Sequence, residues 1–195
     1  MRNIAIFASG SGTNAENIIK YFSNGKTGKV TLVLSNKREA YVLKRAAGLN
    51  VKSLFFEHTD FYGSDSVLNT LLKYKIDFVV LAGFMLLMPE NILSNFEGRI
   101  VNIHPALLPK YGGKGMFGDR VHKAVLANSE SESGITIHYV NRFYDEGNII
   151  FQAKCKVMPG DTPESLASRI HKLEYAHFPE VIDNLIEKLP ERIRK

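Results

Sequence analysis

The stretch Arg99-Ile-Val-Asn-Ile-His-Pro-Ala-Leu-Leu-Pro-Lys-Tyr111 contains the end of an apolar strand and the polar groups that follow from it. Pro105 stops the strand, because proline lacks the backbone donor that a sheet ladder needs. Side chains alternate along a strand, so Asn102 and His104 share one face at its end. An amide donor beside a group that exchanges protons near neutral pH suits a reaction in which charge grows on a carbonyl oxygen while a nitrogen loses a proton.

An isolated Asn-x-His-Pro sequence is better explained by a hydrogen-bonded asparagine and a satisfied histidine at an ordinary strand end. The segments on either side therefore decide the interpretation. Upstream, four short apolar runs are typical of strands covered on both faces; they lie at 3–8, 30–34, 51–55 and 77–83. Between them, apolar residues at helical spacing predict three helices, at 14–22, 38–47 and 64–74. The run at 77–83 is the most hydrophobic, so we expect it at the centre of the sheet.

Downstream, the pattern changes to mixed strands. Residues 134–140 alternate between apolar and polar, and 149–157 forms a second strand, so we predict an antiparallel pair. A helix is predicted over 119–128. A long last helix opens at Asp161 or Thr162 before Pro163, and Pro179 is expected to kink it. We therefore predict one α/β domain over 1–195, with a phosphate-binding half over 1–100 and a catalytic half over 101–195.

Length and composition are those of an ordinary globular protein. The 195 residues are 45% hydrophobic and 23% charged, enough for one well-formed core and incompatible with global disorder. The single cysteine, Cys155, excludes an internal disulfide and a cysteine-based metal cluster, and its strand-like setting predicts a buried hydrophobe. No apolar stretch approaches the ~20 residues of a membrane span, and the chain starts directly with a strand. We expect a cytoplasmic protein with no membrane partner.

The net charge of +5 is modest and its Lys and Arg residues are scattered. The densest basic cluster lies at 188–195, and we interpret it as a solvated tail. A small anionic substrate accounts for this charge as well as a nucleic acid does. We therefore expect no nucleic-acid partner.

Ser9-Gly-Ser-Gly-Thr13 joins the first strand to the first helix. Bare backbone N–H groups and the positive end of a helix dipole form a phosphate cradle, and Thr13 with Glu16 predicts a capping box. The loop lacks the Gly-Lys-Ser/Thr of a P-loop and the third glycine of a dinucleotide site. A tight turn that needs positive φ is the alternative; the position after the first strand favours a monophosphate.

Two further features bear on ligand binding. Large apolar residues at 84–88 follow the central strand, where they either pack in the core or form a pocket for an aromatic ring. Glu174 falls at the edge of the apolar face of the last helix, where an ion pair with a nearby Lys or Arg is the alternative to a binding role.

The chain resembles the glycinamide ribonucleotide transformylase family. Its members are folate-dependent formyltransferases of purine synthesis. Asn102-Ile-His-Pro105, the Leu-Leu-Pro that follows it and the downstream Asp145 are specific to formyltransferases, whereas the Gly-Thr-Asn loop and the late Glu174 are typical of this family among them. Matching segments run nearly end to end; they are 9–14, 35–37, 81–85, 102–105, 107–110, 134–140, 145 and 173–174.

The resemblance implies a Rossmann-like formyltransferase fold with a mostly parallel central sheet, an antiparallel C-terminal pair and helices on both faces. It implies transfer of a formyl group from the cosubstrate 10-formyltetrahydrofolate to the amine of glycinamide ribonucleotide, with no metal. Asn102 would donate to the oxyanion, and a protonated His104 would act as electrophile and proton donor. Asp145 would support the charge on His104, because an opposed carboxylate raises the pKa of a histidine.

The resemblance also implies the substrate contacts. Gly12, Thr13 and Asn14 correspond to the residues that hold the ribosyl phosphate, and Glu174 to the carboxylate that grips the ribose hydroxyls, with His171 in the same segment. The two walls of the folate pocket correspond to 85–88 and 141–145; the cofactor residues expected are Met85, Leu86, Leu87, Met88, Asn102, Asn141 and Tyr144.

This chain departs from the family at three places. Leu86 stands where members commonly have arginine, and no arginine lies near the start of the predicted 64–74 helix. The segment 112–118 is glycine-rich and longer than usual.

Several other functions compete with this one. Methionyl-tRNA formyltransferase would need a further C-terminal domain and a deformylase an N-terminal one, so we expect neither. A sugar-nucleotide formyltransferase differs only in the acceptor amine and is the nearest alternative. A non-catalytic nucleotide-binding module would have no use for a proton-transfer group facing an amide, and an RNA-binding role rests on charge alone. We expect small-molecule partners only, in a monomer or homodimer.

Overall fold

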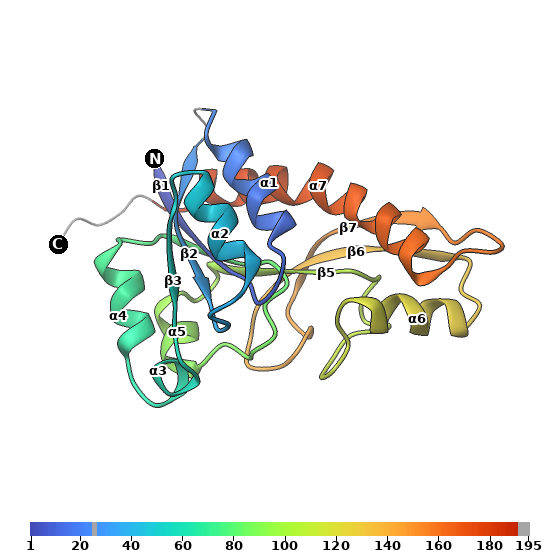
Figure 1. The fold of residues 1–195 in the computed structure, drawn as a ribbon, viewed down its shortest axis with the longest axis horizontal. Helices are drawn as coiled ribbons and strands as arrows, with labels where there is room; N and C mark the ends of the chain where they lie inside the picture. The colour runs from blue at the N-terminus through green and yellow to red at the C-terminus, as the bar shows by residue number, and fades with distance from the viewer. Residues whose placement is uncertain (25–26, 191–195) are drawn as a thin grey trace.

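A computed structural model describes residues 1–24 and 27–190 and shows one seven-stranded sheet between two layers of helices (Figure 1). The strands are β1 (Arg2–Phe7), β2 (Gly28–Ser35), β3 (Lys52–Phe55), β4 (Phe78–Leu81), β5 (Ile100–His104), β6 (Glu132–Tyr139) and β7 (Ile149–Lys156). The helices are α1 (Thr13–Phe22), α2 (Tyr41–Gly48), α3 (His58–Tyr62), α4 (Ser66–Lys73), α5 (Glu90–Asn95), α6 (Asp119–Ala127) and α7 (Pro163–Glu187). The end of the basic tail, 191–195, lies outside the described residues.

The strand order is β3-β2-β1-β4-β5-β6-β7. Strands β1 to β5 are parallel, and β6 runs antiparallel to both β5 and β7. The predicted α/β fold, with its parallel sheet and antiparallel C-terminal pair, is confirmed. β4, the most hydrophobic run, is the middle strand and is buried along its whole length.

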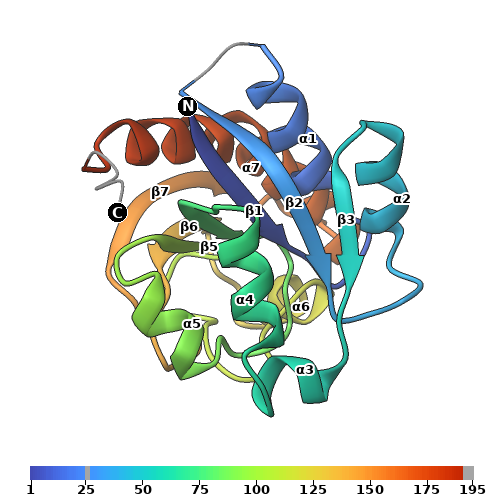
Figure 2. The ribbon, with the colours of Figure 1, turned by 90° about the vertical axis from the view of Figure 1, so that its left-hand side faces the viewer.

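The two faces of the sheet carry separate cores. On one face, α1, α2, α6 and α7 pack against side chains such as Ile6, Val80 and Ile103. On the other, α3, α4 and α5 pack against the alternate side chains, including Phe7, Val79 and Leu81. Figure 2 shows the two sets of helices on opposite sides of the sheet. Because strand side chains alternate, a continuous apolar strand feeds both cores at once.

The order of the strands creates a switch point between β1 and β4, because the chain leaves β1 towards β2 on one side and returns to β4 on the other. In open α/β sheets, ligands bind beyond the carboxyl ends of the strands at such a point. The glycine loop after β1 and the Asn102–His104 end of β5 both lie at this edge.

Two local predictions were wrong, and two short helices were missed. Helix α1 has Gly12 as its N-cap, at φ 75°, and no side-chain cap bond, so Thr13 does not form a capping box; the Glu16 carboxylate pairs with Lys20 and Arg45 instead. Cys155 is only half-buried, since β7 is an edge strand with one side of its ladder unpaired. The short helices α3 and α5 were not predicted, because five or six residues give too little periodicity to detect.

Helix α7 continues through Pro179 and packs against β6, β7, α1 and α6. Its buried stripe recurs every four residues over most of its length; the members are Leu166, Ile170, Glu174, Phe178, Ile182 and Ile186. Glu174 is thus a carboxyl group placed within an apolar stripe, one turn before the fully buried Phe178.

We predict that Phe178→Ala lowers the free energy of unfolding by about 3–5 kcal/mol, because it empties a closed part of the core. Glu180→Ala, at an exposed position on the same helix, should change it by less than about 0.5 kcal/mol. Urea titration monitored by circular dichroism measures both. Equal stability of the two variants would contradict the packing described for α7.

Candidate active site

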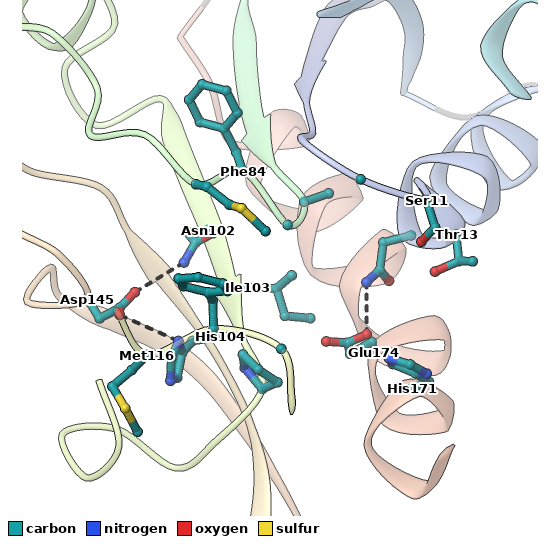
Figure 3. A pocket seen from close by; sticks show the side chains of 18 of the residues that line it. Ser11, Thr13, Phe84, Asn102, Ile103, His104, Met116, Asp145, His171 and Glu174 are labelled. Carbon is teal, nitrogen blue, oxygen red and sulfur yellow. Dashed lines mark hydrogen bonds and ion pairs between the residues drawn. The ribbon is translucent and has the colours of Figure 1, made fainter. Parts of the chain in front are cut away.

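A cavity of about 340 Å³ opens at the carboxyl ends of β1, β4 and β5, within the range of small-molecule sites. Segments far apart in sequence line it; they include 10–14, 82–85, 102–105, parts of 113–118, His122, Tyr144, Asp145, His171 and Glu174. Figure 3 shows two groups of polar side chains in this cavity, with Ile103 between them. Asn102, His104 and Asp145 form one group, and Thr13, His171 and Glu174 lie in the other.

The structure brings the three predicted catalytic residues together. The Asn102 amide nitrogen lies 3.4 Å from Asp145 Oδ1, and His104 Nδ1 lies 3.5 Å from Asp145 Oδ2. β5 supplies the first two residues on one face, as predicted, and the loop between β6 and β7 supplies Asp145. Both distances are longer than an ordinary N–H···O hydrogen bond. The three side chains therefore face one another but do not form short hydrogen bonds among themselves.

Asp145 is held as a carboxylate. Burial opposes its ionisation, but His138, His104 and the backbone N–H of Gly113, 2.9 Å from Oδ2, favour the charge more strongly. The pKa of Asp145 is therefore lowered. Its backbone has φ 57°, a conformation uncommon outside glycine, asparagine and aspartate.

His104 differs from expectation in its protonation. Its Nε2 lies 2.8 Å from the Tyr111 carbonyl, and only 3% of the residue is exposed. Burial lowers the pKa of His104 more than Asp145 and the Tyr111 carbonyl raise it, and the nearby His138 lowers it further. The lowered pKa favours a neutral imidazole near neutral pH, whereas the family resemblance implied an imidazolium.

His138 is a member of the site that the sequence analysis did not assign. It lies opposite Asn102 in the β5–β6 ladder, and its Nε2 lies 3.1 Å from the Asn102 amide nitrogen. Nδ1 lies 2.8 Å from the Tyr139 carbonyl, which can only accept, so the proton belongs on Nδ1 and Nε2 accepts from Asn102. Alternation along β6 places His138 on the same face as Thr136, but only the cross-strand register shows that it lies opposite Asn102.

The other end of the cavity is built around the start of α1. A Cβ at Gly12 would lie 2.8 Å from the Cα of Val42, so only glycine fits there. The Asn14 side chain donates to Glu174 at 2.8 Å, while its Oδ1 is buried without a partner among the described residues. Glu174 is 6% exposed, and burial raises its pKa against the opposing effects of Asn14 and His171.

The remaining predicted substrate residue, His171, is exposed at the cavity and stacks on Tyr175. His122 was not assigned a role from the sequence. It lines the cavity from α6, is 2% exposed, and its Nδ1 has no partner in the described part of the chain. Burial lowers its pKa, and His171 and His104 lower it further against Asp119.

The predicted folate wall is only partly at the cavity. Met85 and Tyr144 line it, whereas Leu86, Leu87, Met88 and Asn141 do not. After Gly83, at φ 70°, the chain turns so that Met88 is buried in the core with α4 and α5 and Leu86 packs against it. The Asn141 side chain accepts from the backbone N–H of Phe143 within its own loop. A folate-binding role for these residues stays a prediction.

Two properties of the described residues bear on partners. No group of three or more His, Cys, Asp and Glu side chains within 1–24 and 27–190 is arranged to bind a metal ion. No helix in this part of the chain has the length and apolar character needed to cross a membrane.

Known proteins are similar to this chain in sequence. The chain is 40% identical over 193 residues to the chloroplastic phosphoribosylglycinamide formyltransferase of Arabidopsis thaliana; the match covers 96% of this chain and 66% of that protein, slightly under two thirds of its length. It is 36% identical over 187 residues to the phosphoribosylglycinamide formyltransferase of Haemophilus influenzae, covering 93% of this chain and 86% of that protein.

A solved structure is also similar to this chain in fold. Glycinamide ribonucleotide transformylase 1 from Symbiobacterium toebii superimposes with a TM-score of 0.89 at 35% identity, covering 100% of this chain and 92% of that one. A family model described as formyl transferase matches residues 2–182, which hold every side chain of the cavity. The family match over residues 2–182, the sequence identities and the shared fold show that the chain belongs to the formyl transferase family.

Proposed function

We propose that the protein is a phosphoribosylglycinamide formyltransferase, which transfers a formyl group from 10-formyltetrahydrofolate to the amine of glycinamide ribonucleotide in purine biosynthesis. One observation carries the proposal. The glycine loop before α1 and the buried carboxyl group of Glu174 lie at one end of a single cavity, and Asn102, His104 and Asp145 lie at the other end. A ribosyl phosphate with an extended amine would reach from the first end to the second. The names of the relatives support the same reaction.

The loop end would hold the ribosyl phosphate. Gly12 lets the backbone approach a ligand closely, and the N–H groups at the start of α1, at Thr13 and Asn14, favour an anion. Glu174 would accept hydrogen bonds from the ribose hydroxyls, and the unpartnered Oδ1 of Asn14 offers a second acceptor beside it. His171 stands at the rim of this end.

The other end would stabilise the charge of formyl transfer. Attack of the amine on the formyl carbon converts the carbonyl oxygen into an oxyanion. One hydrogen of the Asn102 amide is engaged by His138, and the other faces Asp145 at the long distance of 3.4 Å. Because that contact is long, the second hydrogen would be available to an oxyanion formed in the cavity.

The proton would travel through His104. Because its pKa is lowered, His104 starts neutral, and it would accept the proton that the attacking nitrogen loses. Asp145 would stabilise the imidazolium so formed, and His104 would return the proton to the leaving nitrogen as the C–N bond to the folate breaks and the formyl C=O re-forms. No step of this sequence calls on a metal ion.

The finer statements stay predictions: the folate donor itself, the two halves at 1–100 and 101–195, a monomer or homodimer, and a cytoplasmic location. They follow from the resemblance and the composition.

The function is tested by following tetrahydrofolate production from 10-formyltetrahydrofolate by absorbance, with and without glycinamide ribonucleotide. We expect turnover only when the ribonucleotide is present. Hydrolysis of the donor without it would overturn the proposal in favour of a deformylase. No reaction in either case would reject this acceptor, and sugar-nucleotide amines would be assayed next.

We predict that His104→Ala and Asp145→Asn each reduce kcat by roughly 10²–10⁴-fold, because each removes a member of the proton path. Unchanged melting temperatures would show that the fold is intact. Turnover within a few-fold of the unaltered protein in either variant would contradict these roles.

The pH dependence follows from the lowered pKa of His104. A neutral acceptor is needed, so kcat/KM should be lost only as pH falls through a value below the usual ~6.5 of histidine. Asp145 raises the pKa of His104, so Asp145→Asn should move this acid limb to still lower pH. A limb that moves upward in Asp145→Asn would contradict the assigned electrostatics.

We predict that Glu174→Ala raises KM for glycinamide ribonucleotide by roughly 10–100-fold, the effect of losing hydrogen bonds to a charged group. KM for the folate should change little, because Glu174 lies at the other end of the cavity. Glu180→Ala, exposed on the same helix, is the matched control. A larger effect on the folate than on the ribonucleotide would reverse the assignment of the two ends.

A further inference from the structure

The two ring nitrogens of His104 are not equivalent in this structure. Nε2 lies 2.8 Å from the carbonyl oxygen of Tyr111, and Nδ1 lies 3.5 Å from Asp145 Oδ2. A carbonyl oxygen can only accept a hydrogen bond, so the neutral ring carries its hydrogen on Nε2. Nδ1 is then the nitrogen with a free lone pair, and it faces the Asp145 carboxylate.

Tyr111 is held in an unusual way. Its backbone has φ 58°, a left-handed conformation that a bulky residue adopts only when its surroundings impose it. Its hydroxyl donates to Glu130 Oε1 at 2.8 Å, and neither residue lines the catalytic cavity. The same oxygen accepts from the Lys110 ammonium at 2.8 Å. The phenol therefore ties this loop to the end of α6.

The residues that follow Tyr111 hold the partner of His104. The Gly113 N–H donates to Asp145 Oδ2 at 2.9 Å. A Cβ at Gly112 would lie 2.5 Å from Leu108 Cδ2 and 3.2 Å from the Cβ of Asp145, so the backbone passes directly against that residue. Three consecutive residues thus contact both members of the histidine–carboxylate pair.

We propose that Tyr111 is a positioning residue for formyl transfer: its carbonyl fixes the hydrogen of neutral His104 on Nε2, so that Nδ1 beside Asp145 is the nitrogen that accepts and returns the proton. The bond between the Tyr111 hydroxyl and Glu130 keeps that carbonyl in place from outside the cavity. The effect on turnover rests on the function proposed above; the position of the hydrogen does not.

Other charged and titratable groups also face His104. Asp145 raises its pKa and His138, from β6, lowers it, while His122 of α6 is near enough to interact electrostatically with it. The Tyr111 carbonyl is the group in direct contact with Nε2, and it too raises the pKa of His104. Loosening this carbonyl should therefore lower the pKa of His104 and leave the other three groups in place.

The first test uses the full chain without substrate. Imidazole ¹⁵N chemical shifts, recorded at a pH where His104 is neutral, report which nitrogen carries the hydrogen. We expect Nε2–H. A hydrogen on Nδ1 would overturn the proposal, whatever acceptor amine the enzyme uses, so this result is independent of the proposed function.

The second test compares Tyr111→Phe and Glu130→Gln with Lys110→Met. The first two weaken the link between the hydroxyl and the carboxylate, whereas the third removes only the exposed ammonium from the same oxygen. We expect the first two to lower kcat roughly tenfold or more, since small misplacements of reacting groups are costly, with both KM values within twofold. We also expect the acid limb set by His104 to move to lower pH, and Lys110→Met to behave as the unaltered protein.

The shift in the acid limb separates positioning from a general loss of structure, which would lower the active fraction without moving the limb. Melting temperatures verify folding, and if Tyr111→Phe fails to fold, Glu130→Gln carries the test. If Tyr111→Phe or Glu130→Gln folds and shows the same kcat and the same acid limb as the unaltered protein, the proposed role of the Tyr111–Glu130 bond is overturned. An equal shift in Lys110→Met would also overturn it, because the effect would then come from surface charge.

Discussion

The partly buried carboxylate of Asp145 is the constraint on which the site depends. A charge that is largely taken out of water must be met by donors, and here the backbone N–H of Gly113 donates to Oδ2 at 2.9 Å while the Asn102 amide faces Oδ1 at 3.4 Å. The rings of His104 and His138 lie 3.5 Å from Oδ2 and Oδ1. Each donor that satisfies the carboxylate is thereby oriented by it, so the same contacts that make its burial tolerable also assemble the catalytic cluster.

The sheet makes this meeting possible. β5 is parallel to β4 and antiparallel to β6, so its carboxyl end lies beside both the switch point and the start of β6. The ladder places His138 opposite Asn102, and the loop that leaves β6 returns Asp145 to the same edge. A one-residue slip between β5 and β6 would turn His138 to the opposite face, because side chains alternate. The register is therefore as important to the site as the residues themselves.

Much of this arrangement could be predicted from the sequence. The strands, the long helices and the shared face of Asn102 and His104 follow from apolar periodicity and from Pro105, which are local properties. The protonation of His104 and the role of His138 could not, because they depend on burial and on pairing between distant strands. The same limit explains Met88 and Asn141: the family resemblance placed them by position, whereas their contacts follow from where the chain turns after Gly83 and within its own loop.

The two histidines of the cluster show how one backbone feature produces opposite chemistry. Each gives a ring hydrogen to a backbone carbonyl, His138 through Nδ1 to Tyr139 and His104 through Nε2 to Tyr111. In His138 the free nitrogen is turned to the Asn102 amide and becomes a fixed acceptor, which orients that amide. In His104 the free nitrogen faces a carboxylate that keeps its charge, so a proton that reaches it is stabilised and can be passed on. The direction of each backbone carbonyl, rather than the identity of the ring, separates the orienting histidine from the proton-carrying one.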